Sequence, residues 1–116
     1  MLQRQNLQWQ VRSNMAKGYV IASINVTDPI RYPEYVKQVL PTIEAFEGRF
    51  LVRGGPSKSF ENEPFGDRNV VIEFPSVQHA QDWYDSELYA PLKQMRINAS
   101  DSVQTIVAGV DQEVGG

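Results

Sequence analysis

The sequence contains no cysteine and a single histidine in 116 residues. The absence of cysteine excludes disulfide bonds, thiolate metal sites and cysteine nucleophiles. Lys and Arg number 11 against 14 Asp and Glu, which gives a net charge of −3. Nucleic acids and anionic membranes are bound by clustered cations, so this balance argues against both as partners. No apolar run approaches the roughly 20 residues needed to cross a bilayer.

The composition is that of one globular domain, with 41% hydrophobic and 22% charged residues. We expect that domain at residues 16–111, with a flexible N-terminal extension at 1–15 and a flexible tail at 112–116. The extension is rich in Gln, Asn and Arg and lacks the continuous apolar stretch of a secretory signal, so a cytoplasmic protein is expected. Alternating apolar residues in it leave open a second interpretation, an arm that adds to a sheet edge or to a partner.

Short β-branched and aromatic runs predict four strands. They are expected at residues 18–26, 49–53, 68–74 and 102–110. Apolar residues spaced by three and four predict a helix that starts after Asp28 and Pro29, which suit an N-cap and a first helical position. Gly48 ends this helix. Pro41 predicts a kink or break near residues 38–40, because proline lacks an N–H and crowds the preceding turn.

The segment after the third strand predicts two further helical pieces. Ser76 is a suitable N-cap for the first of them. Its inner side is expected to carry Val77, Ala80, Trp83 and Tyr84. After an interruption at residues 85–86, the second piece is expected to carry Leu88, Leu92, Met95 and Ala99 on its inner side.

The predicted order of elements is β-α-β-β-α-β, which gives an α+β fold of the ferredoxin-like, split βαβ type. Its four-stranded antiparallel sheet has the helices on one face only. Each strand carries apolar residues on both sides, as in the pairs Tyr19 and Val20, Val70 and Val71, and Ile106 and Val107. An uncovered apolar face usually meets a partner, so we expect a homodimer whose two sheets form an α/β barrel.

Several motifs in a fixed order resemble a known family. They are the runs GRFLVRGG at 48–55 and VIEFPS at 71–76, followed by Ala80, Trp83, Tyr84, Ser86, Tyr89, Leu92 and Arg96. Over about residues 16–110 the chain is similar to the domain of unknown function 1330 family. The resemblance implies a chain of the dimeric α/β-barrel superfamily, which also holds cofactor-independent monooxygenases and muconolactone isomerase, and it implies no particular reaction. Leu88 departs from the family pattern, in which proline is frequent there.

Polar residues inside the strands are the first candidates for a site. Ser23 and Asn25 share one side of the first strand, and Asn25 is a candidate ligand contact. Because the second and third strands are antiparallel neighbours, Arg53 and Glu73 are expected to face each other. One interpretation is a pair that fixes the hairpin register or the dimer. The other is a clamp in which Arg53 binds a ligand carboxylate and Glu73, the best catalytic candidate, orients the ligand or acts as a base.

A second candidate set combines aromatic side chains with one cation. It comprises Tyr32, Trp83, Tyr84, Ser86, Tyr89 and Arg96. Arg96 follows Tyr89 by two helical turns and is expected to point toward the same space, with Tyr32 and Tyr35 on the opposite side. These residues are interpreted either as core and dimer contacts or as the wall of a pocket. Such a pocket suits a small aromatic or oxygenated organic acid.

The remaining polar residues predict neither a metal site nor a cofactor site. His79 follows the helix cap Ser76 by three residues and is expected in solvent. Glu61, Glu63 and Asp67 fit a solvated loop better than a cation site. Three functions stay open: a homodimer that binds a small molecule, a cofactor-independent oxygenase or isomerase, and a structural dimerisation module.

Overall fold

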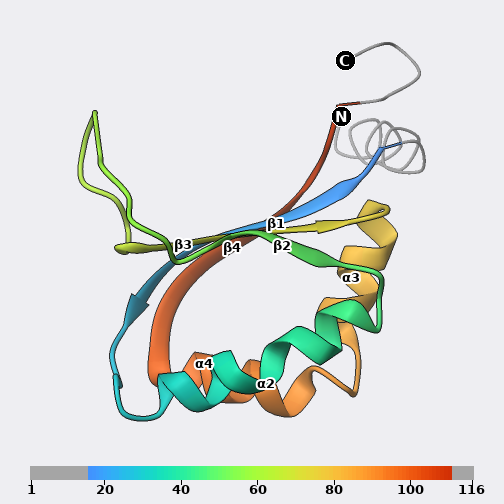
Figure 1. Ribbon diagram of the computed structural model, residues 1–116, viewed down its shortest axis with the longest axis horizontal. Helices are drawn as coiled ribbons and strands as arrows, with labels where there is room; N and C mark the ends of the chain where they lie inside the picture. The colour runs from blue at the N-terminus through green and yellow to red at the C-terminus, as the bar shows by residue number, and fades with distance from the viewer. Residues whose placement is uncertain (1–15, 111–116) are drawn as a thin grey trace, which may run out of the picture.

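The computed structural model describes residues 16–110, so the predicted extension and tail lie outside the described residues. This part forms one sheet and three helices (Figure 1). In chain order the elements are β1 (Gly18–Val26), α2 (Tyr32–Glu44), β2 (Arg49–Arg53), β3 (Arg68–Phe74), α3 (Val77–Asp85), α4 (Ala90–Ala99) and β4 (Ser100–Ala108). No helix in residues 16–110 has the length and apolar character needed to cross a membrane.

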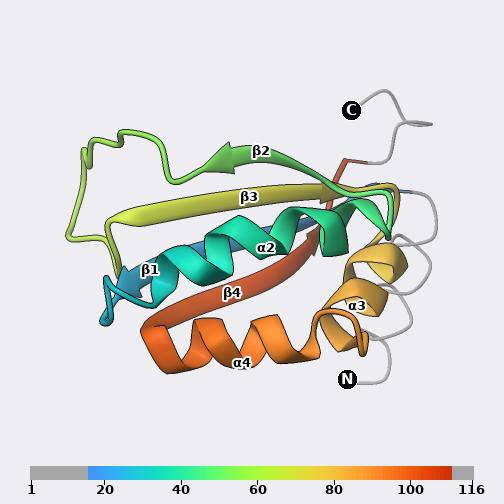
Figure 2. The same ribbon diagram turned by 60° about the horizontal axis from the view of Figure 1, so that its bottom comes forward.

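The sheet is antiparallel throughout, with strand order β2-β3-β1-β4. The three helices of residues 16–110 all lie against one of its faces, and none of them covers the other face (Figures 1 and 2). Even-numbered residues of β1 and β3 point toward the helices and form the centre of the core, as Val20, Ala22, Ile24, Val70, Ile72 and Phe74. The predicted ferredoxin-like fold, with its helices on one face, is confirmed.

Helix α2 differs from the prediction at its start and at Pro41. The Asp28 carboxylate accepts hydrogen bonds from the N–H groups of Ile30 and Arg31, so it caps a turn, and the helix itself begins only at Tyr32. The break predicted near residues 38–40 is wrong, because α2 continues through Pro41 to Glu44. Pro41 lies on the exposed side of the helix, where the carbonyl that loses its partner can face water.

The predictions for α3 and α4 hold in their main points. Ser76 accepts a hydrogen bond from the N–H of His79, which confirms it as the N-cap of α3. The interruption after Asp85 is confirmed, but Leu88 is exposed and was wrongly placed on the inner side. Strand β4 begins at Ser100, two residues earlier than predicted, because its pairing with β1 extends to Val26.

The bare face of the sheet is apolar at its centre, as predicted. Ile21 on β1 is 46% exposed and Val103 on β4 is 50% exposed. Leu51 and Val52 add exposed apolar surface on β2. We call this surface the open face. It is the part of the fold that has no helix to cover it.

Candidate functional site

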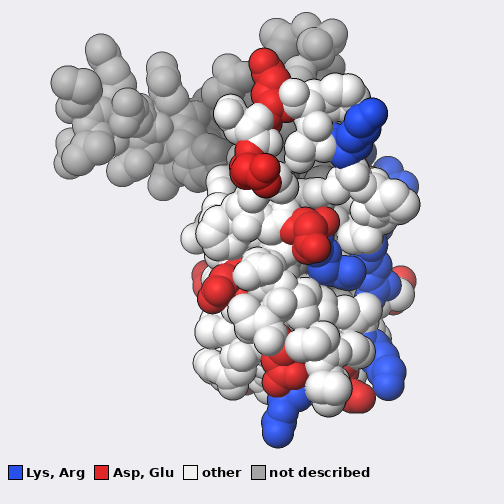
Figure 3. All heavy atoms as spheres, turned by 90° about the vertical axis from the view of Figure 1, so that its left-hand side faces the viewer, with Lys and Arg blue, Asp and Glu red and all other residues white. Residues whose placement is uncertain are grey.

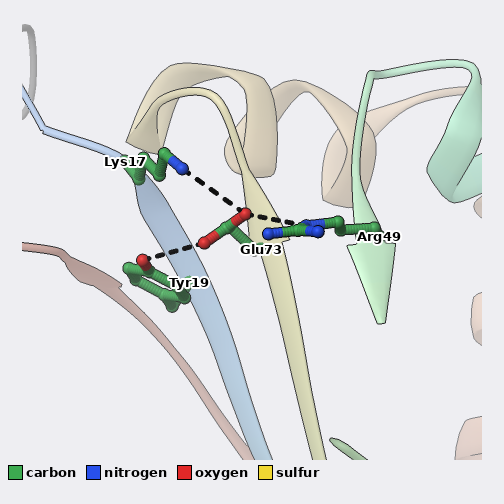
Figure 4. Close-up of polar contacts among 4 residues, drawn as sticks. All are labelled: Lys17, Tyr19, Arg49 and Glu73. Atoms are coloured by element: carbon green, nitrogen blue, oxygen red, sulfur yellow. Dashed lines mark hydrogen bonds and ion pairs between the residues drawn. The ribbon is translucent and has the colours of Figure 1, made fainter. Parts of the chain in front are cut away.

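Glu73 is the centre of a polar cluster on the open face (Figure 4). Its carboxylate accepts hydrogen bonds from Arg49 Nε at 2.9 Å and from the Tyr19 hydroxyl at 3.0 Å, and Lys17 Nζ lies 3.7 Å away. Burial alone would raise the pKa of Glu73, but the hydrogen bonds from Arg49 and Tyr19 and the charges of Lys17 and Arg49 lower it. Glu73 is therefore a carboxylate held ionised by its neighbours across β1, β2 and β3.

The predicted pairing of Arg53 with Glu73 is wrong. Strand β3 places Glu73 opposite Arg49 and places Val70 opposite Arg53. A bulge between Phe50 and Val52 adds one residue to β2. The residues after the bulge therefore lie on the opposite side of the sheet from the side that strict alternation would give them. Arg53 consequently points to the helix side and donates to the carbonyl of Val36 at 2.7 Å.

The other polar candidate of the strands, Asn25, lies with Glu73 on the side away from the helices. It is exposed and pairs across the sheet with Asp101. Its neighbour in the pattern, Ser23, exchanges hydrogen bonds with the backbone of Gly66. Neither residue joins the aromatic candidates.

Trp83 and Tyr89 lie in the core between the helices and the sheet. They are 1% and 0% exposed, and their ring centroids are 4.1 Å apart. The Trp83 indole N–H donates to Thr42 Oγ1 at 3.0 Å, and the hydroxyls of Tyr35 and Tyr89 share a hydrogen bond of 3.0 Å. Burial first, and then the charge and hydrogen bond of Tyr89, raise the pKa of Tyr35. The expected approach of Tyr35 to this cluster is confirmed.

Three other candidates of the aromatic set lie in different surroundings. Ser86 donates to the carbonyl of Trp83 and accepts from the N–H of Tyr89, so its hydroxyl joins α3 to α4. Tyr32 is buried at the start of α2, with the Arg68 guanidinium 5.5 Å from the centre of its ring. Tyr84 is half-buried on α3 and lies in the walls of two surface hollows, which are described below.

Arg96 on α4 is a buried cation, 4% exposed. Its Nε lies 3.3 Å from the Tyr89 hydroxyl, which confirms the expected contact, and its Nη1 donates to Ser102 Oγ at 2.6 Å. The amide oxygen of Gln104 points to Arg96, because the reverse orientation would set the amide NH₂ group against the N–H donors of Arg96. In this orientation the oxygen accepts from Nε at 3.0 Å and from Nη1 at 3.1 Å. Within residues 16–110, no carboxylate lies within ion-pair distance of Arg96.

Burial alone would lower the pKa of Arg96, because desolvation disfavours a charge. The contacts with Tyr89, and after it the charges of Tyr35 and Tyr84, outweigh this effect and raise the pKa. Arg96 therefore stays positive at every physiological pH, surrounded by neutral oxygen atoms.

Two hollows lie beside β4, with residues of α3, α4 and β4 in their walls. Figure 2 shows α4 running alongside β4, the strand at this edge of the sheet. The hollows measure about 760 Å³ and about 390 Å³ and share Tyr84 and Gln104 in their walls. Arg96 lies in the wall of the larger one, with Phe65 and Ile97. We call the two together the β4 groove. Each of the two hollows by itself is within the size range of sites for small organic ligands.

A separate interior cavity of about 20 Å³ lies between α2 and the sheet. Its walls include Arg53 and Arg68, whose buried Nε has no hydrogen-bond partner among the described residues. This space is about the size of one water molecule and is too small for an organic acid. Arg53 also lies on β2, the sheet edge opposite β4. The structure therefore does not bring the candidates Arg53 and Arg96 together.

The sequence analysis assigned no role to Gln104 or to Arg68. Both are polar residues inside strands, and both point toward the helices, Gln104 opposite Ala22 and Arg68 opposite Ile24. The available signal was their even-numbered register, which they share with the core residues of β1 and β3. Applied to every polar strand residue, that register separates Gln104 and Arg68 from Asn25 and Glu73.

The charged groups elsewhere make local contacts. His79 shares a hydrogen bond of 2.7 Å with Ser76 Oγ, and its Nε2 lies 3.3 Å from Glu47, so it is only partly in solvent. In residues 16–110 no three His, Asp or Glu side chains gather as metal ligands. On the face of Figure 3, acidic and basic side chains are interspersed, and several of opposite sign lie side by side.

A family model for a domain of unknown function, DUF1330, matches residues 17–110. The chain belongs to this family. No match was found among curated protein sequences. The resemblance inferred from the motifs at 48–55 and 71–76 is thereby confirmed, and it covers nearly all of the described DUF1330 domain.

Solved structures share the fold of this DUF1330 chain. A protein of unknown function from Rhodopseudomonas palustris has 15% identity and a TM-score of 0.69, with 92% of each chain covered. A putative antibiotic biosynthesis monooxygenase from Caulobacter crescentus has 16% identity and a TM-score of 0.57, covering 93% of this chain and 98% of that one. SnoaB, a cofactor-independent oxygenase from Streptomyces nogalater, has 11% identity and a TM-score of 0.56, covering 81% and 93%.

Proposed function

We propose that this DUF1330 protein is a homodimer that binds a small aromatic or oxygenated organic acid in the β4 groove. The observation that carries the proposal is Arg96. Arg96 is 4% exposed, and among residues 16–110 its guanidinium is contacted by neutral oxygen atoms of Tyr89, Ser102 and Gln104. A buried charge without a counter-ion is costly, and an anionic ligand offsets that cost.

The walls of the groove suit the rest of such a ligand. Phe65 and Ile97 present apolar surface, and Tyr84 adds an aromatic ring with a polar tip. Ser100 and Ser102 supply hydroxyls to oxygenated substituents. The larger hollow is lined mostly by polar groups, which include the Asp101 carboxylate, and the smaller one mostly by apolar groups.

The homodimer part of the proposal is supported by the open face. Ile21 on β1 and Val103 on β4 expose apolar side chains on neighbouring strands, and Leu51 does so on β2, beyond β3. A second copy of the chain can cover the open face with its own open face, because a two-fold axis packs the same surface of both copies together and both surfaces are apolar. The β4 groove is on the other side of the sheet and stays open in such a dimer.

Turnover by a cofactor-independent oxygenase or isomerase is the alternative. It is supported by the shared fold of two neighbours described as oxygenases, but identities of 11% and 16% carry a fold and not its chemistry. Such a reaction needs a base with a pKa near neutrality. Glu73 has a lowered pKa and lies on the face opposite the groove. Binding is therefore the function that the site supports best.

Titration calorimetry at pH 7 with benzoate, and with benzamide as its uncharged analogue, tests the binding proposal. We expect heat from benzoate and none from benzamide. In the Arg96→Gln variant, benzoate affinity is expected to fall about tenfold or more, as for loss of a charged hydrogen-bond partner. Because Arg96 is buried, Ile97→Trp provides a second variant, which fills the groove from its exposed rim and is also expected to abolish binding.

Arg53→Ala is the matched control, since it removes a cation at the opposite edge of the sheet. We expect this variant to bind benzoate as the unaltered protein does. Benzoate binding that depends on Arg53 and survives Arg96→Gln and Ile97→Trp would place the site elsewhere and overturn the proposal. Equal heats from benzoate and benzamide would show that no acid is recognised.

A further inference from the structure

Gln104 is the residue at which the hollows of the helix side meet. Alone among the described residues, it lies in the walls of both parts of the β4 groove and of the interior cavity beneath α2. It points toward the helices from β4, between Ser102 and Ile106 in the same register. Its side chain therefore stands between the groove and the interior.

The contact with Gln104 uses part of the hydrogen-bonding capacity of Arg96. A single amide oxygen accepts from both Nε and Nη1 of Arg96, at 3.0 Å and 3.1 Å. A carboxylate binds a guanidinium through two parallel N–H groups on one edge, either Nε with Nη2 or Nη1 with Nη2. The amide oxygen carries only a partial charge, so it makes a weaker partner than a carboxylate in the same place.

We propose that Gln104 is a stand-in for the carboxylate of the ligand and that it leaves Arg96 when the acid binds. This inference rests on the proposed function and specifies how the site recognises its ligand. The acid carboxylate binds two parallel N–H groups on one edge of the Arg96 guanidinium, and the Gln104 side chain moves off the guanidinium. Because Gln104 also separates the spaces, its movement joins the β4 groove to the apolar cavity beneath α2.

The Gln104→Glu variant places a carboxylate on Arg96 from within the chain, with almost no change in shape. We expect benzoate affinity in this variant to fall about tenfold or more, since the ligand then competes with an ion pair. Without ligand, the variant is expected to melt at a higher temperature than the unaltered protein at pH 7. That gain is lost as the pH falls and the new carboxyl group is protonated.

Two further variants make the result specific to the Gln104 position. Gln38→Glu introduces the same change at an exposed position of α2, outside the walls of the β4 groove, and is expected to bind benzoate within about twofold of the unaltered protein. Gln104→Ala removes the stand-in and leaves the guanidinium fork free. We expect it to bind benzoate as tightly as the unaltered protein or more tightly.

Benzoate binding by Gln104→Glu at the unaltered affinity would overturn the inference, since it would show that ligand and side chain do not compete. Loss of binding in Gln104→Ala would overturn it too, because Gln104 would then be a ligand contact. Gln104→Ala keeps the test decisive if Gln104→Glu fails to fold. Failure of the proposed function is seen separately, as absence of benzoate binding by the unaltered protein or its persistence in Arg96→Gln.

Discussion

At the scale of single residues, the ion cluster of Glu73 makes the free energy of unfolding depend on pH in the acidic range. The unfolded carboxyl has a pKa of about 4.3, and the cluster lowers the pKa in the folded chain. The stabilisation is therefore fully present above about pH 4.3 and is lost as the pH falls through the lower, folded value. Its origin is the set of contacts with Lys17, Tyr19 and Arg49.

We expect Glu73→Gln to reduce the free energy of unfolding at pH 7 by about 1 kcal/mol or less, the range of partly exposed ion pairs. At pH 3 the difference from the unaltered protein is expected to shrink. Urea denaturation at both values measures this. Glu44→Gln, at an exposed position of α2, is the control and is expected to change little. A constant difference at both pH values would contradict the assignment.

The strands that carry Arg53 and Glu73 were predictable from the sequence, but the residues that these two side chains contact were not. Both lie in strands that the sequence locates correctly. Which residues face each other depends on the register of β2 against β3 and on the bulge after Phe50, and neither leaves a sequence pattern that fixes it. The contact of Arg96 with Tyr89 was predictable because it lies within one helix and its preceding turn.

At the scale of elements, α2 tolerates a proline in its interior. Pro41 removes one backbone hydrogen bond from a helix whose other residues keep theirs. The burial of Tyr35, Val39 and Ile43 on the inner side holds the helix in place despite that loss. Local propensity predicted a break here, and tertiary packing determined the outcome.

Pro41→Ala is expected to raise the free energy of unfolding by about 1–2 kcal/mol, because the restored N–H outweighs the greater freedom of the unfolded chain. Pro33→Ala is the matched control. Pro33 lies in the first turn of α2, where a proline is well tolerated, so the change there is expected within about 0.5 kcal/mol. Urea denaturation measures both. A loss of stability in Pro41→Ala would show that the helix depends on this proline.

At the scale of the whole molecule, the strand order and the one-sided helix layer followed from the order of elements alone. Strands at 18–26, 49–53 and 68–74 match the predicted bounds, and crossover handedness then leaves few arrangements. The site was less accessible to prediction, because the β4 groove is formed by α3, α4 and β4 together. Its recognition needs distances between segments that only the folded chain supplies.

The proposed dimer predicts that a charge on the open face produces monomers. Ile21→Asp and Val103→Asp are each expected to shift the protein from dimer to monomer in sedimentation equilibrium, because an unpaired carboxylate is costly in an apolar interface. Leu88→Asp, at an exposed apolar position between α3 and α4, is the control and is expected to remain dimeric. A monomeric unaltered protein at tens of micromolar would contradict the dimer.

The point where the β2–β3 connection rejoins the sheet determines which residues of this connection can change. A Cβ on Gly66 would lie 2.2 Å from the Ile24 carbonyl oxygen, so only glycine fits, and its N–H binds Ser23. Between this anchored point and β2, residues 55–65 are exposed. Insertions and replacements there leave the sheet intact, yet they reshape the rim at Phe65. Changes in residues 55–65 can therefore alter the wall of the β4 groove at Phe65 without disturbing the sheet.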